Sequence, residues 1–133
     1  MSWKIYLAVG IGSGVGSALR YLMSLGSLAL LGSYFPWGTL IANVIGSWLI
    51  GWLAATVSHF PQGQLARFQP LLIAGFCGGF TTFSLFSLES LYLMQQGLVW
   101  VALLYILVSL PLWLGAAKLG ERLALFQQPR SQD

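Results

Sequence analysis

The stretch Gly75–Phe86, with the sequence GFCGGFTTFSLF, decides how this chain folds. It lies inside an apolar segment long enough to cross a membrane, yet it holds three glycines, two adjacent threonines and four phenylalanines. Glycine weakens a helix by about 1 kcal/mol relative to alanine, and an unpaired backbone group in hydrocarbon costs several kcal/mol. The composition therefore predicts a break in a membrane helix, where backbone groups are exposed to an ion or to another chain.

The whole chain has the composition of a membrane protein. Of its 133 residues, 57% are hydrophobic and 7% are charged, and the mean hydropathy is +0.79. Soluble domains carry about 25% charged residues, and one span needs about 20 apolar residues. We expect an all-α protein with a single membrane domain over residues 1–133. The expected spans are 5–25, 37–57, 70–95 and 98–119, and the expected break in the third is at about 75–81.

The first expected span carries small residues and one basic residue. Its pairs Gly10/Gly14 and Gly12/Gly16 have the spacing that lets membrane helices approach closely. The span is too long for a cleavable signal peptide, so we expect it to be retained. Near its end lies Arg20, which can either extend to the membrane interface or line a wet vestibule.

Three further spans carry polar residues whose roles stay open at this level. Asn43, in the second span, can form an interhelical hydrogen bond or donate to a passing anion. In the third span, Phe83, Phe86 and Glu89 recur on one helix face. A carboxylate within a span indicates a functional site unless it lies near the interface. Apart from Phe83 and Phe86, the polar thread consists of Asn43, Thr81, Thr82, Ser84, Glu89, Tyr105 and Ser109.

These residue types point to ion passage rather than catalysis. The single histidine, His59, is far in sequence from the single cysteine, Cys77, and no nucleotide motif or metal-ligand spacing is present. Hydroxyl and amide donors can replace water around an anion, as can the positive edges of phenyl rings. A cation can instead use carbonyls freed at a helix break. An ion channel or transporter and a non-transporting scaffold remain open, whereas an enzyme or a nucleic-acid-binding protein is not indicated.

Three motifs resemble one known family. They are Gly12-x-Gly14-x-Gly16-x-x-x-Arg20-Tyr21, Trp37-Gly38-Thr39-Leu40 followed by Asn43 and Gly46, and GFCGGFTTFSLFSLE over residues 75–89. With these motifs the chain resembles the Fluc (CrcB-type) fluoride channels over nearly its whole length. The resemblance implies a fluoride-selective passive channel that exports fluoride across the inner (plasma) membrane. A small proton-coupled multidrug exporter is the alternative, but such a pump needs an acid in its first span, and this chain has none.

The resemblance also implies an assembly and a set of site residues. Two copies would form an antiparallel, dual-topology homodimer with two pores. The backbone carbonyls of Gly78 and Thr81 would hold a structural sodium ion at the dimer interface. The rings of Phe83 and Phe86 would face fluoride, and Asn43 would donate to it. On or beside the polar track would lie Thr82, Ser84, Glu89, Tyr105 and Ser109, with Arg20 at a vestibule.

Two features depart from the family pattern. Leu85 stands where the family has a threonine between the two phenylalanines, so one hydroxyl is missing from the expected track. The second departure is the distribution of charge, because the side that holds both termini carries nearly all of the basic residues. This bias predicts one orientation with both termini inside, whereas the family implies both orientations. The basic residues on that side are Lys4, Arg67, Lys118, Arg122 and Arg130.

Overall fold

The chain folds as an all-helical membrane protein. The structure is a computed structural model that describes residues 2–127, so Arg130 of the basic bias lies outside it. Four segments are long and apolar enough to cross a membrane, namely Trp3–Leu31, Trp37–His59, Pro70–Gln95 and Val99–Phe126. The predicted all-α class and the four predicted membrane helices are thus confirmed. Three of the segments are longer than expected, since helix continues beyond the apolar core of each span.

Local signals set the ends of the first helices. Helix α1 (Trp3–Leu31) begins after Ser2, whose hydroxyl accepts a hydrogen bond from the Lys4 amide at 3.4 Å. It ends at Gly32, which has φ of 80°, a backbone conformation that favours glycine. Helix α2 (Trp37–His59) follows directly after Pro36. Helix α6 (Val99–Phe126) continues through Pro111 without ending there.

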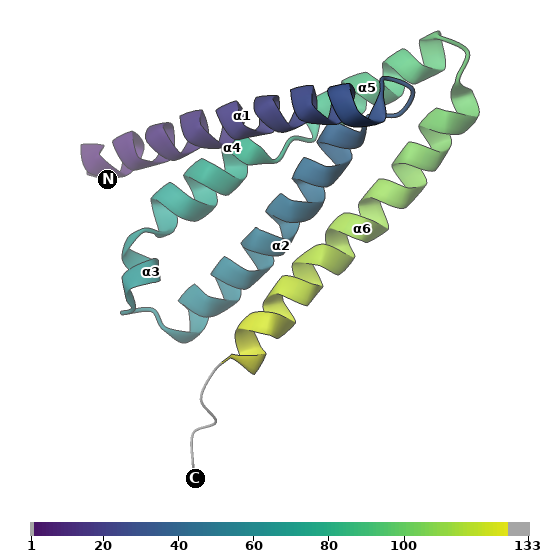
Figure 1. Ribbon diagram of the computed structural model, residues 1–133. Helices are drawn as coiled ribbons and strands as arrows, with labels where there is room; N and C mark the ends of the chain where they lie inside the picture. The colour runs from purple at the N-terminus through teal and green to yellow at the C-terminus, as the bar shows by residue number, and fades with distance from the viewer. Residues whose placement is uncertain (1, 128–133) are drawn as a thin grey trace.

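The third membrane segment is built from several pieces (Figure 1). After the short helix α3 (Gln64–Arg67) come the π-helix η1 (Pro70–Cys77) and α4 (Gly78–Phe80), and then α5 (Ser84–Gln95). Residues 75–80, which the sequence analysis placed in the break, are helical, and the residues between helices are 81–83. Thr81 is extended there, with φ of −86° and ψ of 156°.

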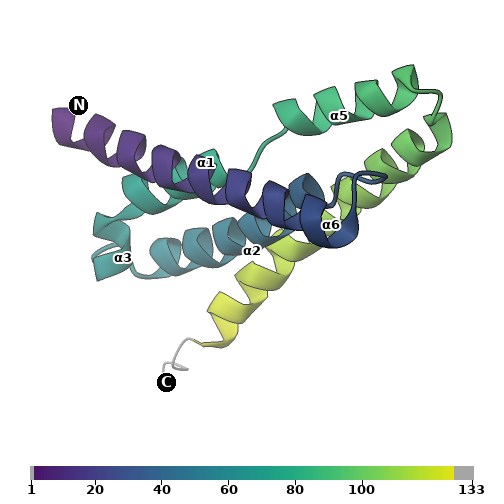
Figure 2. The ribbon, with the colours of Figure 1, turned by 45° about the horizontal axis from the view of Figure 1, so that its top comes forward.

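Helix α1 packs on η1 and α4 (Figures 1 and 2), and glycine residues let their backbones approach closely. A Cβ atom added to Gly12 would collide with the Leu71 carbonyl, and one added to Gly16 would collide with the Phe76 carbonyl. Gly10 and Gly14 face open space within the described residues. Of the two small-residue pairs in this helix, therefore, only Gly12/Gly16 makes a helix contact inside one chain.

Helices α2 and α6 lie side by side, and α5 meets α6 near the short connection that joins them (Figure 2). Gly51 lies against the Ala117 carbonyl and Gly120 against the Trp48 carbonyl, so α2 and α6 also meet backbone to backbone. At the other end of this pair the contact is made by side chains. The buried cluster there consists of Leu40, Phe86, Leu93, Ala102 and Tyr105.

Candidate functional site

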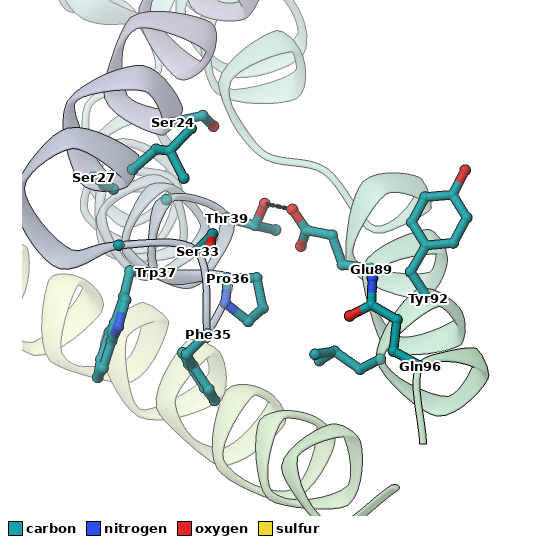
Figure 3. Close-up of a pocket in the computed structure, with 14 residues that line it drawn as sticks. Ser24, Ser27, Ser33, Phe35, Pro36, Trp37, Thr39, Glu89, Tyr92 and Gln96 are labelled. Atoms are coloured by element: carbon teal, nitrogen blue, oxygen red, sulfur yellow. Dashed lines mark hydrogen bonds between the residues drawn. The ribbon is translucent and has the colours of Figure 1, made fainter. Parts of the chain in front are cut away.

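Glu89 is held by hydroxyls from two other helices. Its Oε1 accepts a hydrogen bond from Thr39 Oγ1 of α2, and its Oε2 accepts one from Tyr105 OH of α6, both at 2.8 Å. Figure 3 shows Thr39 and Glu89 facing each other. Each carboxylate oxygen therefore has a neutral donor, and Glu89 joins α2, α5 and α6. Tyr105 and Thr39 are almost fully buried.

A cavity of about 280 Å³ with a mixed polar and apolar lining opens beside this carboxylate (Figure 3). Its walls come from the end of α1, the start of α2 and the end of α5. Small hydroxyls and an amide line it, so it can hold a solvated ion. The lining residues with polar side-chain groups are Ser24, Ser27, Ser33, Trp37, Thr39, Glu89, Tyr92 and Gln96.

Asn43 holds the residues between the two halves of the third segment. Its Nδ2 donates to the Thr82 carbonyl and its Oδ1 accepts from the Thr82 amide, both at 2.8 Å. These two bonds replace the helix bonds that the Thr82 backbone would otherwise make, which explains why α4 ends before it. Asn43 is 4% exposed. Of the two roles left open for Asn43, the interhelical hydrogen bond is the one present in this structure.

Thr82 and Ser84 lie together at the start of α5. The Thr82 hydroxyl accepts from the Leu85 amide at 3.1 Å, as a helix-capping side chain does, and lies 3.3 Å from the Ser84 hydroxyl. At position 85, where the family pattern has a threonine hydroxyl, this chain offers only the Leu85 backbone amide, which donates to Thr82. The two predicted track residues are neighbours, and Thr82 also has a structural role.

The aromatic rings gather around Phe86. Its ring centroid lies 5.4 Å from that of Phe83, 4.9 Å from Tyr105 and 4.8 Å from Trp113. The last two contacts are edge-on, at 64° and 75° between the ring planes. Phe86 is 4% exposed whereas Phe83 is 65% exposed, so one ring of the predicted pair lies inside the chain and the other on its surface.

Side chains of helix α1 donate to backbone carbonyls of the third segment. Ser17 Oγ and Arg20 Nε both donate to the Gly79 carbonyl at 3.3 Å, and Ser13 Oγ donates to the Gly75 carbonyl at 3.3 Å. Arg20 therefore contacts the end of α4. Within the described residues it has no hydrogen bond to Asn43, Glu89 or another predicted track residue.

Two other carbonyls of this region keep their acceptor capacity. In residues 2–127, no hydrogen bond is made to the carbonyl oxygens of Gly78 and Thr81. The Thr81 and Thr82 amides, which could reach Gly78, bond Cys77 and Asn43, and the Leu85 amide, which could reach Thr81, bonds the Thr82 hydroxyl. Oxygen ligands of this kind suit a hard cation. The described residues hold no cluster of three or more histidine, cysteine, aspartate or glutamate side chains that could bind a metal ion. Any ion here would depend on backbone oxygens.

Sequence reasoning missed several residues of the site. Thr39 lies in one of the quoted motifs, in the first turn of α2. The available signal was a hydroxyl in one span that could pair with the acid of another, Glu89. Trp113 gave no signal in the sequence, since a tryptophan in an apolar span is ordinary. Ser109, which was predicted, is fully buried, and its Oγ has no hydrogen-bond partner in the described chain, like Trp113 Nε1.

Comparison with known proteins identifies the family. A family described as "CrcB-like protein, Camphor Resistance (CrcB)" matches residues 7–121. The chain belongs to the CrcB family. Among its CrcB relatives, "Fluoride-specific ion channel FluC 1" of Nitrobacter hamburgensis is 45% identical over 90% of this chain and 94% of its own length.

Two further relatives carry the same kind of name. "Fluoride-specific ion channel FluC" of Nitrobacter winogradskyi is 44% identical, covering 90% of this chain and 94% of its own length. The protein of that name from Rhizobium meliloti is 46% identical, covering 80% of this chain and 84% of its own length. The resemblance drawn from the motifs is confirmed, and the class is a channel rather than an enzyme. The multidrug-exporter alternative is not favoured.

Proposed function

We propose that this chain is a passive fluoride-selective channel of the plasma membrane. Fluoride leaves the cytoplasm through this channel, and the export lowers fluoride toxicity. The observation that carries the proposal is the cluster of ring edges and hydroxyls around Phe86, in a CrcB chain 45% identical to a protein named as a fluoride channel. Neutral donors can replace the water around a small anion without trapping it. Donors that bind the ion weakly enough to release it permit rapid conduction.

The proposed path follows α5 and the facing side of α6. The rings of Phe83 and Phe86 present positive edges, and the hydroxyls of Thr82, Ser84 and Ser109 can donate to the ion. Asn43 stands beside this path and would donate to fluoride when its bond to the Thr82 carbonyl opens. Tyr105 and Thr39 already donate to Glu89, so the carboxylate repels the anion less than a free one would.

The active assembly in this proposal is an antiparallel homodimer with two paths. Phe83 is exposed on a single chain, so a second copy can bring its own α5 residues to it. The third membrane segments, each interrupted at residues 81–83, would meet at the dimer centre. The carbonyls of Gly78 and Thr81 from both copies would hold sodium, which supplies a fixed positive charge near the anion path. Arg20 would lie at the vestibule end of that path.

Reconstitution into liposomes tests the proposed activity. Vesicles loaded with fluoride or with chloride at equal concentration are given a potassium ionophore, and anion release is followed with ion-selective electrodes. We expect fluoride to leave within seconds of ionophore addition and chloride to stay. Liposomes without protein serve as the control. Equal release of both anions, or release of neither, would refute the proposal.

Labelling in intact cells tests the dual topology. A cysteine added at the C-terminus reports its side of the membrane through an impermeant maleimide. The unmodified chain is the control, because its one cysteine, Cys77, is buried. We expect about half of the chains to be labelled before lysis and the rest only after it. Labelling of all chains or of none before lysis would mean a single orientation; the basic-residue bias predicts none, because it places both termini inside.

A further inference from the structure

One face of α6 carries three polar side chains in a row. Tyr105, Ser109 and Trp113 are spaced by four residues, so they lie one above the other along the helix. The Tyr105 hydroxyl has a partner in Glu89. Ser109 Oγ and Trp113 Nε1 are both buried, and neither has a hydrogen-bond partner among residues 2–127.

Buried polar atoms without partners are rare enough to require an explanation. The indole N–H of Trp113 can only donate, so the group that satisfies it must be an acceptor. An anion meets that requirement and a cation does not. The Ser109 hydroxyl, one turn away on the same face, can also donate, and at 0% exposure it is shielded from competing solvent.

The position of the indole agrees with an anion partner. The Trp113 ring lies edge-on to Phe86 at a centroid distance of 4.8 Å, and Phe86 is the buried ring of the proposed fluoride path. Tyr105, two helical turns before Trp113 and bonded to Glu89, also contacts Phe86 edge-on. The indole is therefore in direct contact with the proposed path, on the helix that also presents Tyr105 and Ser109 to it.

We propose that Trp113 binds the permeating fluoride through its Nε1–H, with Ser109 as the adjoining donor on the side toward Tyr105. The inference rests on the proposed fluoride channel and extends it by a binding residue on α6. An indole N–H is a neutral donor whose charge does not change with pH. It can therefore bind and release a small anion without exchanging a proton. Fluoride, as the smallest halide, makes the strongest hydrogen bond to such a donor.

Nuclear magnetic resonance of the ¹⁵N-labelled protein tests the binding without measuring flux. The chain has six tryptophans, and the Trp113 indole signal is assigned as the one lost in Trp113→Phe. If that variant does not fold, Phe substitutions at the other five tryptophans assign the signal by elimination. We expect the Trp113 signal to move with fluoride until saturation, and not with chloride at the same ionic strength. A signal unmoved by fluoride, or moved equally by chloride, would overturn the inference.

Efflux from liposomes provides the functional readout. Trp113→Phe keeps a ring against Phe86 and removes only the donor. We expect fluoride efflux to slow at least tenfold, because one hydrogen bond to a charged group is worth roughly a factor of ten or more. The matched control is Trp52→Phe, because Trp52 Nε1 already donates to Gln127 Oε1 at 3.1 Å at the surface. We expect wild-type rates for that control. Unchanged efflux in folded Trp113→Phe would overturn the inference alone, whereas a wild-type chain that releases no fluoride would refute the proposed function.

Discussion

The two halves of the third membrane segment use different means to contact their neighbours. From residue 70 to 80, η1 and α4 pack on α1 through glycine backbone, and Ser13, Ser17 and Arg20 of α1 donate to backbone carbonyls there. From residue 84 to 95, α5 contacts α2 and α6 through hydroxyls, rings and a carboxylate. The first half has the chemistry of a rigid helix contact. The second half presents donors, which an ion can use.

The contrast corrects the simplest interpretation of the glycines. A Cβ atom added to Gly79 would collide with the Ser13 carbonyl, and one added to Gly75 would lie only 2.9 Å from the Val9 carbonyl oxygen. These glycines are needed for close approach to α1, whereas the helix is interrupted after them, where Asn43 takes both backbone groups of Thr82. The close backbone contacts and the side-chain contacts are thus adjacent in the sequence but made with different helices, α1 for the first half and α2 and α6 for the second.

The largest expected effect comes from filling the backbone contact. In Gly16→Val the new Cβ meets the Phe76 carbonyl, which cannot move without shifting α4, so we expect the folded protein to be lost or destabilised by about 3 kcal/mol. Gly14→Val is the control, since nothing described lies within 4 Å of its Cβ. Monodisperse yield and melting temperature in detergent compare the two. Equal behaviour of the two variants would contradict the packing role of this half.

A smaller effect is expected where the two halves join. Asn43→Ala leaves the amide and the carbonyl of Thr82 unpaired, at about 1–3 kcal/mol for each buried group. We expect a lower melting temperature together with a large loss of fluoride efflux. Ser47→Ala, one turn further along α2, is the matched control and should behave as wild type. Full efflux in Asn43→Ala would show that the path does not need this residue.

Much of the fold was predictable because it depends on local composition. Four apolar lengths gave four helices, and Gly12 and Gly16 gave the close contact of α1. The sequence could not tell Gly12/Gly16 from Gly10/Gly14, since both pairs have the same spacing and only tertiary packing selects one. Nor could it fix the interrupted residues at 81–83, because their position depends on Asn43, which is 39 residues away.

The site was predictable only in part for the same reason. Glu89, Tyr105 and Asn43 stand out as polar residues in apolar spans, and the structure brings Glu89 and Tyr105 into contact. Thr39 and Trp113 do not stand out, because a threonine near a helix start and a tryptophan in a span are ordinary. Their importance appears only from the groups that they face (Figure 3 shows Thr39). Arg20 lies on the Gly79 carbonyl, a contact that hydropathy cannot indicate.

The smallest effect is expected at the carboxylate. Tyr105→Phe removes one of the two hydroxyls that bind Glu89 and keeps the ring against Phe86, while Thr39 still donates to the other oxygen. We expect fluoride efflux to fall a few-fold with little change in melting temperature. Tyr6→Phe is the control, since Tyr6 is exposed on α1 and does not line the cavity beside Glu89. An increase in efflux would mean that the bond to Tyr105 holds Glu89 away from the path.

One matched pair tests the division between the halves most directly. Phe80 and Phe86 are each 4% exposed, but Phe80 stacks on Phe76 in the packing half and Phe86 lies in the donor half. Replacing either by isoleucine removes a buried ring, so both variants should lose similar stability. Fluoride efflux from liposomes, normalised to folded protein, is the deciding measurement. We predict that Phe86→Ile slows efflux more than tenfold and that Phe80→Ile keeps it within twofold of wild type; equal losses in both would contradict the account.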